Sequence, residues 1–344
     1  MMKIFFIPLL FIAAFSFAQP YKNLVLEGGG VRGLAYAGAF TGLEKRGILD
    51  QIENVGGTSA GSIAGLMISL GYSAAEIDSI MRHLPLQSFN DGKGGILGKM
   101  KRFKKNYGVY QGERFEKWFS DLIAYKTGND STTFEELHQL HLQNHRYKDF
   151  YCTGSNITRQ QVEIFSYQHT PHVQLKTAVH ISSCIPLYFK PVILDSTGRE
   201  VNAPKKGIIY QYYVDGGLIA NYPITLFDSC ENGPNPMYCD KLKYNPQTLG
   251  LKLERPEQIE QFKHSNNIAP YIIHSRKDYM SAFFNLLLET LERKTFSMAE
   301  EKGRTIYISQ GTIGATIRKM KKEEEQELFE NGEKAVDAFF DKVK

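Results

Sequence analysis

The stretch from Gly57 to Gly61, Gly-Thr-Ser-Ala-Gly, restricts what this chain can fold into more than any other feature. The glycines two places before and after Ser59 permit a sharp backbone turn, because neighbours without side chains leave room for the chain to fold back. The stretch lies between a short strand predicted over Ile52–Gly56 and a helix rich in small residues predicted over Ser62–Leu70. Such a strand-to-helix turn pushes a serine hydroxyl out of the sheet. We therefore predict an enzyme with Ser59 as its nucleophile.

A second glycine-rich turn spans residues 28–33, between a strand predicted over Asn23–Leu26 and a helix predicted over Leu34–Arg46. One interpretation is a dinucleotide site, because the turn fits G-x-G-x-x-G after a strand and before a helix. This alternative, an NAD(P)-dependent oxidoreductase, needs an acidic residue about 20 positions further on. Only Asp50 or Glu53 is available, in a stretch that is at best a weak strand.

The same turn also suits an oxyanion site, because amide N–H groups that no side chain blocks can stabilise negative charge. Arg32 would then either stabilise the loop or add positive potential. The candidate oxyanion residues are Gly28, Gly29, Gly30, Arg32 and Gly33.

A nucleophilic serine needs a base, and none of the nine histidines is an obvious partner. Asp215 is the better candidate, since it ends an apolar strand predicted over Tyr212–Val214 and precedes Gly216 and Gly217, which allow close backbone approach. An aspartate with its ordinary pKa of about 3.9 is a weak base, so the site would have to be partly desolvated and in direct contact with Ser59. The alternative is an ordinary Asp-Gly turn.

Strand-like and helix-like segments alternate along most of the chain, which predicts an α/β fold with a mostly parallel central sheet covered by helices. Ser73 and Glu76 form a capping-box pattern that predicts the start of another helix. Further strands are predicted over Phe150–Cys152, Gln161–Phe165, Thr248–Leu253 and Thr305–Ser309, and further helices over Gln174–Ser183, Lys277–Arg293 and Glu323–Lys342. The glycine- and lysine-rich segment 85–110 interrupts the alternation and is expected to be a variable surface excursion. We find no internal repeat and no long linker, so residues 19–344 are expected to form one domain.

The N-terminus has the features of a secretory signal. Met1-Met2-Lys3 is a short positive start, residues 4–17 are almost wholly apolar, and small residues lead to a cleavage point after Ala18. The apolar run is shorter than the roughly 20 residues of a membrane span. We expect residues 1–18 to be removed and the protein to be exported, periplasmic or secreted.

Four cysteines follow the signal segment, and an exported protein would meet an oxidising compartment. Cys230 and Cys239 could form a disulfide, whereas Cys152 and Cys184 lie in apolar surroundings and are expected to be buried free thiols. No CxxC pair occurs, so no zinc site is expected.

The charge balance is nearly even, with 41 Lys and Arg against 37 Asp and Glu, which gives no case for a nucleic-acid binder. Basic residues concentrate between Lys93 and Lys105, interleaved with apolar ones. This mixture suits an anionic lipid interface, and it equally fits a solvated basic loop. The basic members are Lys93, Lys99, Lys101, Arg102, Lys104 and Lys105, and the apolar members are Ile96, Leu97, Met100 and Phe103.

Taken in order, the turn at 28–33, the serine turn at 57–61 and Asp215-Gly216-Gly217 resemble the patatin-like phospholipases. Two flanking blocks carry the resemblance further, one from Ala178 to Pro191 and one from Asp215 to Pro223. The likeness runs from about Tyr21 to the end of the chain.

The resemblance implies a three-layer α/β sandwich and a serine–aspartate dyad without histidine that hydrolyses acyl esters of phospholipids and related lipids. Carried over by motif, Ser59 is the nucleophile, Asp215 the base and the turn at 28–33 the oxyanion hole. No cofactor or metal is implied, and a lipid substrate implies contact with a membrane surface. A lipid-binding protein that keeps the fold without catalysis remains a further alternative.

Overall fold

The computed structural model describes residues 21–344 except residues 232, 234, 240, 266, 277, 281, 284–285, 287–297, 315–317 and 342–344. The predicted signal segment and most of the helix predicted over Lys277–Arg293 lie outside the described residues.

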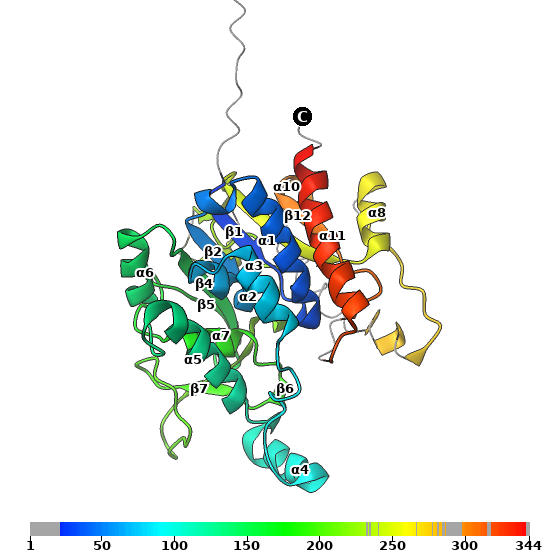
Figure 1. Ribbon diagram of the computed structural model, residues 1–344. Helices are drawn as coiled ribbons and strands as arrows, with labels where there is room; N and C mark the ends of the chain where they lie inside the picture. Colours follow the sequence, from blue (N-terminus) through cyan, green and yellow to red (C-terminus); the bar gives the residue numbers. More distant parts are fainter. Residues whose placement is uncertain are drawn as a thin grey trace, which may run out of the picture.

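An eight-stranded mixed sheet forms the centre of the protein, in the order β12-β11-β1-β2-β4-β8-β7, with β5 also paired to β4 (Figure 1). The five strands from β12 to β4 run parallel to one another, whereas β5, β8 and β7 are antiparallel to their neighbours. The strands are β1 (Asn23–Leu26), β2 (Asn54–Gly57), β4 (Asp149–Asn156), β5 (Gln161–Phe165), β7 (Val192–Leu194), β8 (Gln211–Asp215), β11 (Thr248–Glu254) and β12 (Thr305–Ser309). The predicted mostly parallel sheet is therefore confirmed.

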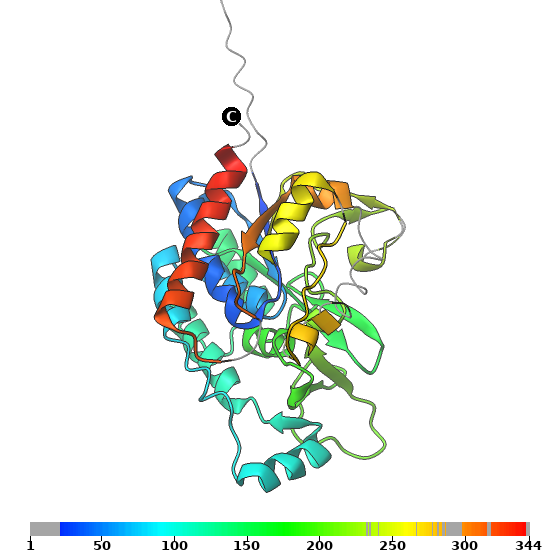
Figure 2. The same ribbon diagram turned by 90° about the vertical axis from the view of Figure 1, so that its right-hand side faces the viewer.

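Helices flank the sheet. Figure 2 shows β12 between α11 on one side and α8 on the other. The helices are α1 (Ala35–Lys45), α2 (Ala60–Ser69), α3 (Ala74–Arg82), α4 (Gly95–Asn106), α5 (Glu113–Thr127), α6 (Phe134–Gln143), α7 (Leu175–Ser182), α8 (Pro256–His264), α10 (Met298–Gly303) and α11 (Lys322–Asp341). Short 3-10 turns are η1 (Gly30–Leu34), η2 (Leu49–Gln51), η3 (Gly216–Leu218) and η4 (Pro236–Tyr238). The capping box predicted at Ser73 and Glu76 is present at the start of α3.

The first and last long helices join the two ends of the chain in one core. A Cβ on Gly38 of α1 would lie 1.8 Å from the carbonyl oxygen of Phe329 in α11, and one on Gly332 would lie 2.0 Å from that of Ala35. The two backbones therefore touch, which only glycine permits. A single cluster of buried apolar residues runs from Leu24 to Val336.

Strand register brings the three predicted turns to one edge of the sheet. Leu26 at the end of β1 pairs with Gly57 at the end of β2, so the turns that follow them lie side by side. Gly57 also pairs with Cys152 of β4, and Asp215 of β8 pairs with Gly154, two residues further along β4. Because β8 is antiparallel, it delivers its final residue to this edge from the opposite direction.

The region of residues 150–160 differs from the prediction. Gly154 to Asn156 were expected to belong to a connection after a three-residue strand, but they continue β4 and pair with both β5 and β8. The added length of β4 is what gives Asp215 a strand to pair with.

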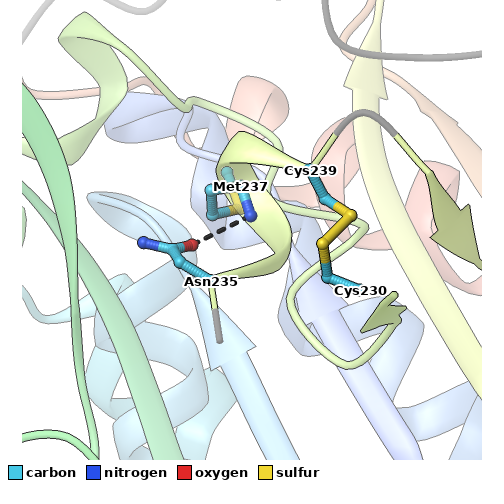
Figure 3. Close-up of a disulfide and its surroundings, with 4 residues drawn as sticks. All are labelled: Cys230, Asn235, Met237 and Cys239. Carbon is cyan, nitrogen blue, oxygen red and sulfur yellow. Dashed lines mark hydrogen bonds between the residues drawn. A yellow bond between two sulfur atoms is a disulfide. The ribbon is translucent and has the colours of Figure 1, made fainter. Parts of the chain in front are cut away.

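Two small sheets lie apart from the main one. β3 (Gly108–Tyr110) pairs in parallel with β6 (Leu187–Phe189), and β9 (Ser229–Cys230) pairs with β10 (Leu242–Lys243). The expected disulfide between Cys230 and Cys239 is present (Figure 3), beside a turn in which Asn235 accepts a hydrogen bond from the Met237 amide. Cys152 and Cys184 are buried free thiols, as expected. Within the described residues, no helix has the length and apolar character needed to cross a membrane.

Candidate active site

Ser59 occupies a strained turn between β2 and α2. Its φ of 52° lies in the left-handed region, which non-glycine residues rarely adopt. The Ser59 amide donates to both the carbonyl and the hydroxyl oxygen of Ser182, each at 3.1 Å. These bonds to α7 fix the turn that projects the Ser59 hydroxyl beyond the sheet.

The glycines on either side of Ser59 are required because a side chain at either position would collide with backbone atoms. A Cβ on Gly61 would lie 2.4 Å from the carbonyl oxygen of Leu26, and one on Gly57 would lie 2.6 Å from the backbone of Gly61. Both distances are shorter than any real Cβ contact, and the obstacles are backbone atoms. The elbow can therefore form only with glycine at these two positions.

The structure brings Ser59 and Asp215 together, although 156 positions separate them in the chain. The Ser59 hydroxyl donates to Oδ2 of Asp215 at 2.7 Å, and the Gly217 amide donates to Oδ1 at 2.7 Å. Asp215 is 6% exposed. The predicted contact is confirmed, and both carboxylate oxygens have a donor.

Burial changes the chemistry of this carboxyl group. Desolvation raises the pKa of Asp215 to about 6, and the hydrogen bonds from Ser59 and Gly217 partly offset the rise. A carboxylate with such a pKa is a better proton acceptor than an ordinary aspartate, while it remains ionised at neutral pH. The desolvated site and direct serine contact that a base would need are therefore both present.

Gly216 and Gly217 let the Asp215 loop pack tightly. A Cβ on Gly216 would lie 2.3 Å from the Thr153 hydroxyl oxygen, and one on Gly217 would lie 2.8 Å from Oδ1 of Asn221. Gly216 also meets the Thr153 carbonyl oxygen at 2.5 Å, so this position needs glycine to keep Asp215 against β4, whereas at Gly217 the Asn221 side chain would have to move.

The turn at 28–33 lies directly beside Ser59, and a Cβ on Gly28 would come within 3.2 Å of the Ser59 Cβ. The amide of Gly28 donates to the carbonyl oxygen of Asn221 at 2.9 Å, so Gly28 supplies space and no free donor. The amides of Gly29 and Gly30 have no acceptor within the part of the chain that the structure describes. Gly30 has a φ of 57° and lines the cavity that reaches Ser59.

Arg32 and Gly33 support this turn. The Arg32 guanidinium donates to the Gly29 carbonyl oxygen at 3.0 Å and to Gln310 at the end of β12, which matches the loop-stabilising role considered for it. Gly33 lies against Ala60, the residue after the serine, with its virtual Cβ 3.0 Å from the Ala60 Cβ.

Sequence reasoning did not assign roles to Glu27 and Asn221, which hold the turns together. Asn221 Nδ2 donates to the Gly28 carbonyl oxygen at 3.2 Å and to Oε1 of Glu27 at 3.3 Å, and Oε2 of Glu27 accepts the Leu253 amide at 2.8 Å. The signal for Asn221 was its place in the block that follows Asp215. The only sequence signal for Glu27 was its position as an acidic residue directly after an apolar strand.

An apolar cavity of about 80 Å³ opens beside Ser59. This volume is below the roughly 300–1,000 Å³ of sites that enclose larger ligands, so a long acyl chain would enter only as the lining rearranges. The lining residues are Gly30, Val31, Leu34, Ser59, Ala60, Ile63, Met81, Leu84, Leu86, Phe89, Asn90, Phe115, Ser183, Ile185, Phe189 and Met320.

The dinucleotide alternative finds no support in this geometry. Glu53 precedes β2 and pairs with Lys22, and Asp50 lies on the exposed turn η2, so both are at the opposite end of β2 from the glycine turn. Among the described residues, no histidine hydrogen-bonds to Ser59 or Asp215, and no three His, Cys, Asp or Glu side chains gather as metal ligands.

Comparison with known proteins gives a family. The family model described as patatin-like phospholipase matches residues 24–228. The chain is 30% identical to the uncharacterized protein YqhO of Bacillus subtilis (strain 168), over 62% of this chain and 69% of that protein. It is 26% identical to a probable lipid hydrolase of Invertebrate iridescent virus 6, over 83% of this chain and 89% of that protein.

Among solved structures, VipD from Legionella pneumophila shares the fold, with a TM-score of 0.59 and 17% identity, covering 94% of this chain and 67% of VipD. At this identity the likeness concerns the fold alone.

Proposed function

The chain belongs to the patatin-like phospholipase family, and on this premise we propose that it cleaves carboxylic esters of lipids through Ser59 and Asp215. The family model describes phospholipases and one relative is a probable lipid hydrolase, so the activity that we propose is lipid acyl hydrolysis of phospholipase A or lysophospholipase type. The observation that carries the residue assignment is the 2.7 Å hydrogen bond from the Ser59 hydroxyl to the buried Asp215, at the edge of an apolar cavity.

In the first half of the reaction, Asp215 Oδ2 takes the proton of the Ser59 hydroxyl while Oγ attacks the acyl carbonyl carbon. The carbonyl oxygen becomes an oxyanion, and we assign its binding to the amides of Gly29 and Gly30, which have no acceptor among the described residues. The C–O bond to the alcohol then breaks, and the proton on Asp215 passes to the leaving oxygen. The acyl group stays on Ser59 as an ester.

In the second half, Asp215 takes a proton from water as the water oxygen attacks the acyl-enzyme. The same amides hold the second oxyanion, and the Ser59 oxygen leaves and regains its proton. The fatty acid is released, and both residues return to their starting protonation states. No metal or cofactor takes part, so activity is expected to survive a chelator.

A fluorophosphonate probe tests the assignment, because it modifies activated serines covalently. We expect labelling at Ser59, identified by peptide mass spectrometry. Ser59→Ala is expected to abolish labelling and to lower the rate on a soluble ester by several orders of magnitude. Ser196→Ala is the matched control, because Ser196 is exposed in the turn after Asp195. This substitution is expected to leave both the labelling and the esterase rate unchanged.

The outcomes separate the alternatives. Near-normal esterase activity in folded Ser59→Ala would refute the serine assignment. Absence of labelling in the unmodified protein would favour the lipid-binding alternative without catalysis.

The proposed setting is outside the cytoplasm, at a lipid surface. The N-terminal segment has the pattern of a cleaved signal, and the disulfide between Cys230 and Cys239 fits an oxidising compartment. Residues 19–344 would then act as one hydrolase domain, in keeping with the largest apolar core, which contains residues of both α1 and α11. Mass spectrometry of the exported protein should show Gln19 as the first residue, and an intact Met1 would reject cleavage.

A further inference from the structure

Helix α4 presents its apolar side chains to solvent. Ile96 is 78% exposed and Leu97 81% exposed, and Met100 and Phe103 are also exposed. No residue of α4 is buried. At 100° per residue, Ile96, Met100 and Phe103 form one stripe, with Leu97 beside it. A continuous apolar stripe on the outside of a water-soluble helix marks an interaction surface.

The side of α4 that faces the protein is polar. Gly98, Arg102 and Asn106, spaced four apart, are the partly buried residues of the helix. The Arg102 guanidinium donates to the Val109 carbonyl oxygen at 2.7 Å and to that of Lys93, which fixes the helix to β3. An ordinary surface helix has the reverse arrangement, with its apolar face inward. The orientation of α4 therefore leaves its apolar stripe without a partner in the described part of the chain.

The charge around this stripe has one sign. Lys101, Lys104 and Lys105 are exposed and form no ion pair with a described residue, and Lys99 lies over the Tyr110 ring. No acidic residue occurs between Gly92 and Gly112. Of the two acidic residues that flank this stretch, Asp91 is buried and accepts the amides of Gln111 and Gly112, and Glu113 is exposed at the start of α5. The surface combines exposed apolar groups with unbalanced positive charge, which matches an anionic lipid surface and would repel a second copy of itself.

The position of α4 connects this surface to the cavity at Ser59. Figures 1 and 2 both show α4 at the end of the molecule opposite the C-terminal end of α11. The segment that leads into α4 contributes Leu84, Leu86 and Phe89 to the cavity lining. Phe189 of β6, the strand paired with β3 directly after α4, lines it as well. The elements on both sides of α4 in the fold therefore form walls of the cavity.

We propose that α4 is an interfacial helix that docks the protein on anionic lipid bilayers, with Ile96, Leu97, Met100 and Phe103 entering the interface and the lysines contacting head groups. The inference rests on the proposed function in one respect: docking through α4 would bring the Ser59 cavity to its lipid substrate. Binding to the membrane does not depend on catalysis.

The test is co-sedimentation of the full chain with vesicles of ether-linked lipids, which the enzyme cannot hydrolyse. One set contains phosphatidylcholine alone and the other contains 30 mol% phosphatidylglycerol. Lys101→Gln/Lys105→Gln is compared with Lys241→Gln/Lys243→Gln, a matched pair of exposed lysines near the disulfide. All variants share the same N-terminal segment, so its contribution to binding cancels.

At roughly 1 kcal/mol per lysine near an anionic surface, the α4 pair is expected to weaken binding to the anionic vesicles on the order of 10- to 30-fold. The control pair is expected to change it less than twofold. Leu97→Ser/Met100→Ser is expected to weaken binding to both vesicle types, because it removes apolar side chains whose insertion does not depend on the charge of the lipid. Hydrolysis of a soluble short-chain ester should be unchanged in every variant.

Equal binding by the α4 pair and the control pair would overturn the proposal, as would wild-type binding that ignores both salt and phosphatidylglycerol. An α4-dependent dimer in analytical ultracentrifugation would assign the stripe to a second copy and would also overturn it. Absence of esterase activity in the wild type, with α4-dependent vesicle binding retained, would refute the proposed hydrolysis and leave the docking intact.

Discussion

The turns around Ser59 and helix α4, for which we propose catalysis and membrane docking, are built differently. Around Ser59, the backbones of three turns lie so close that a single added methyl group would collide with a carbonyl oxygen. In α4, no residue is buried, and within the described part of the chain its side-chain hydrogen bonds to the rest of the protein come from Arg102.

The difference corresponds to what each region must do. Proton transfer and oxyanion binding need donors and acceptors held within a few tenths of an ångström, which close packing supplies. A lipid surface has no fixed shape, so a region that contacts it needs exposed apolar groups and charge of the right sign. Rigidity at Ser59 and exposure at α4 are therefore what the two proposed roles require.

Glycine-to-alanine substitution should expose this contrast most strongly. Gly61→Ala places a Cβ 2.4 Å from the Leu26 carbonyl oxygen, and β1 would have to shift to relieve it. We expect a loss of more than about 3 kcal/mol in the free energy of unfolding, measured by urea denaturation, together with loss of esterase activity. In Gly95→Ala of α4, the added Cβ has no atom within 4 Å. Only the left-handed φ of this residue disfavours alanine, so the free energy of unfolding should fall by about 1–2 kcal/mol. Equal losses from the two variants would contradict the contrast.

The pH dependence should also divide the two regions. Because the base must be ionised, the rate on a soluble ester should fall tenfold per pH unit below about 6, and thus on the order of 100-fold at pH 4. Vesicle binding through α4 does not use the Asp215 carboxylate, so it should change little over the same range. A rate that stays level down to pH 4 would show that the burial of Asp215 does not set its pKa.

The proposed reaction centre could be predicted from the sequence because its tightest backbone contacts require glycine, and glycines are visible in the sequence. Gly57, Gly61 and Gly216 occupy positions where no other residue fits, and the strands that precede them are short and apolar. The proximity of Ser59 and Asp215 followed from the order of the motifs through a family resemblance. The strand register that produces it, through the long β4, was not visible, because Gly154 and Ser155 resemble a turn.

The α4 region could be predicted only in part. Its lysines, glycines and apolar residues were recognised, but the pattern fitted a loop as well as an interface. Helices α5 and α6 were also missed, although Thr133 and Glu136 form a capping box at the start of α6. Which side of α4 faces the protein depends on the contact between Arg102 and β3, and no local pattern encodes a contact of that kind.

Removing the buried charge should stabilise the reaction centre. Asp215 binds its proton more tightly in the folded state, so its contribution to stability is fully present below the unfolded pKa of 3.8 and is lost as the pH rises through about 6. Asp215→Asn should therefore raise the free energy of unfolding at pH 8 by about 1–3 kcal/mol while abolishing most activity. Thermal unfolding at pH 8 and at pH 4 measures this, and the gain should shrink at pH 4.

Asp195→Asn is the matched control for that gain. Asp195 is only partly buried, and hydrogen bonds from the Thr197 hydroxyl and from the amides of Thr197 and Arg199 lower its pKa, so its replacement should bring no stabilisation at pH 8. If the free energy of unfolding at pH 8 rises as much in this variant as in Asp215→Asn, burial of the charge does not explain the stabilisation.

The smallest expected effect concerns α4 itself. If the apolar stripe contacts only lipid, Leu97→Ser/Met100→Ser removes no contact in the folded protein, and the free energy of unfolding without vesicles should change by less than about 0.5 kcal/mol. Leu66→Ala in the buried helix α2 should cost about 2–5 kcal/mol, since it leaves a cavity in the core. Urea denaturation of both variants makes the comparison. A loss above about 1 kcal/mol in the α4 variant would mean that its side chains pack against the protein in solution. The stripe would then belong to the folded core, as the glycine turns at Ser59 do, and the division between the two regions would fail.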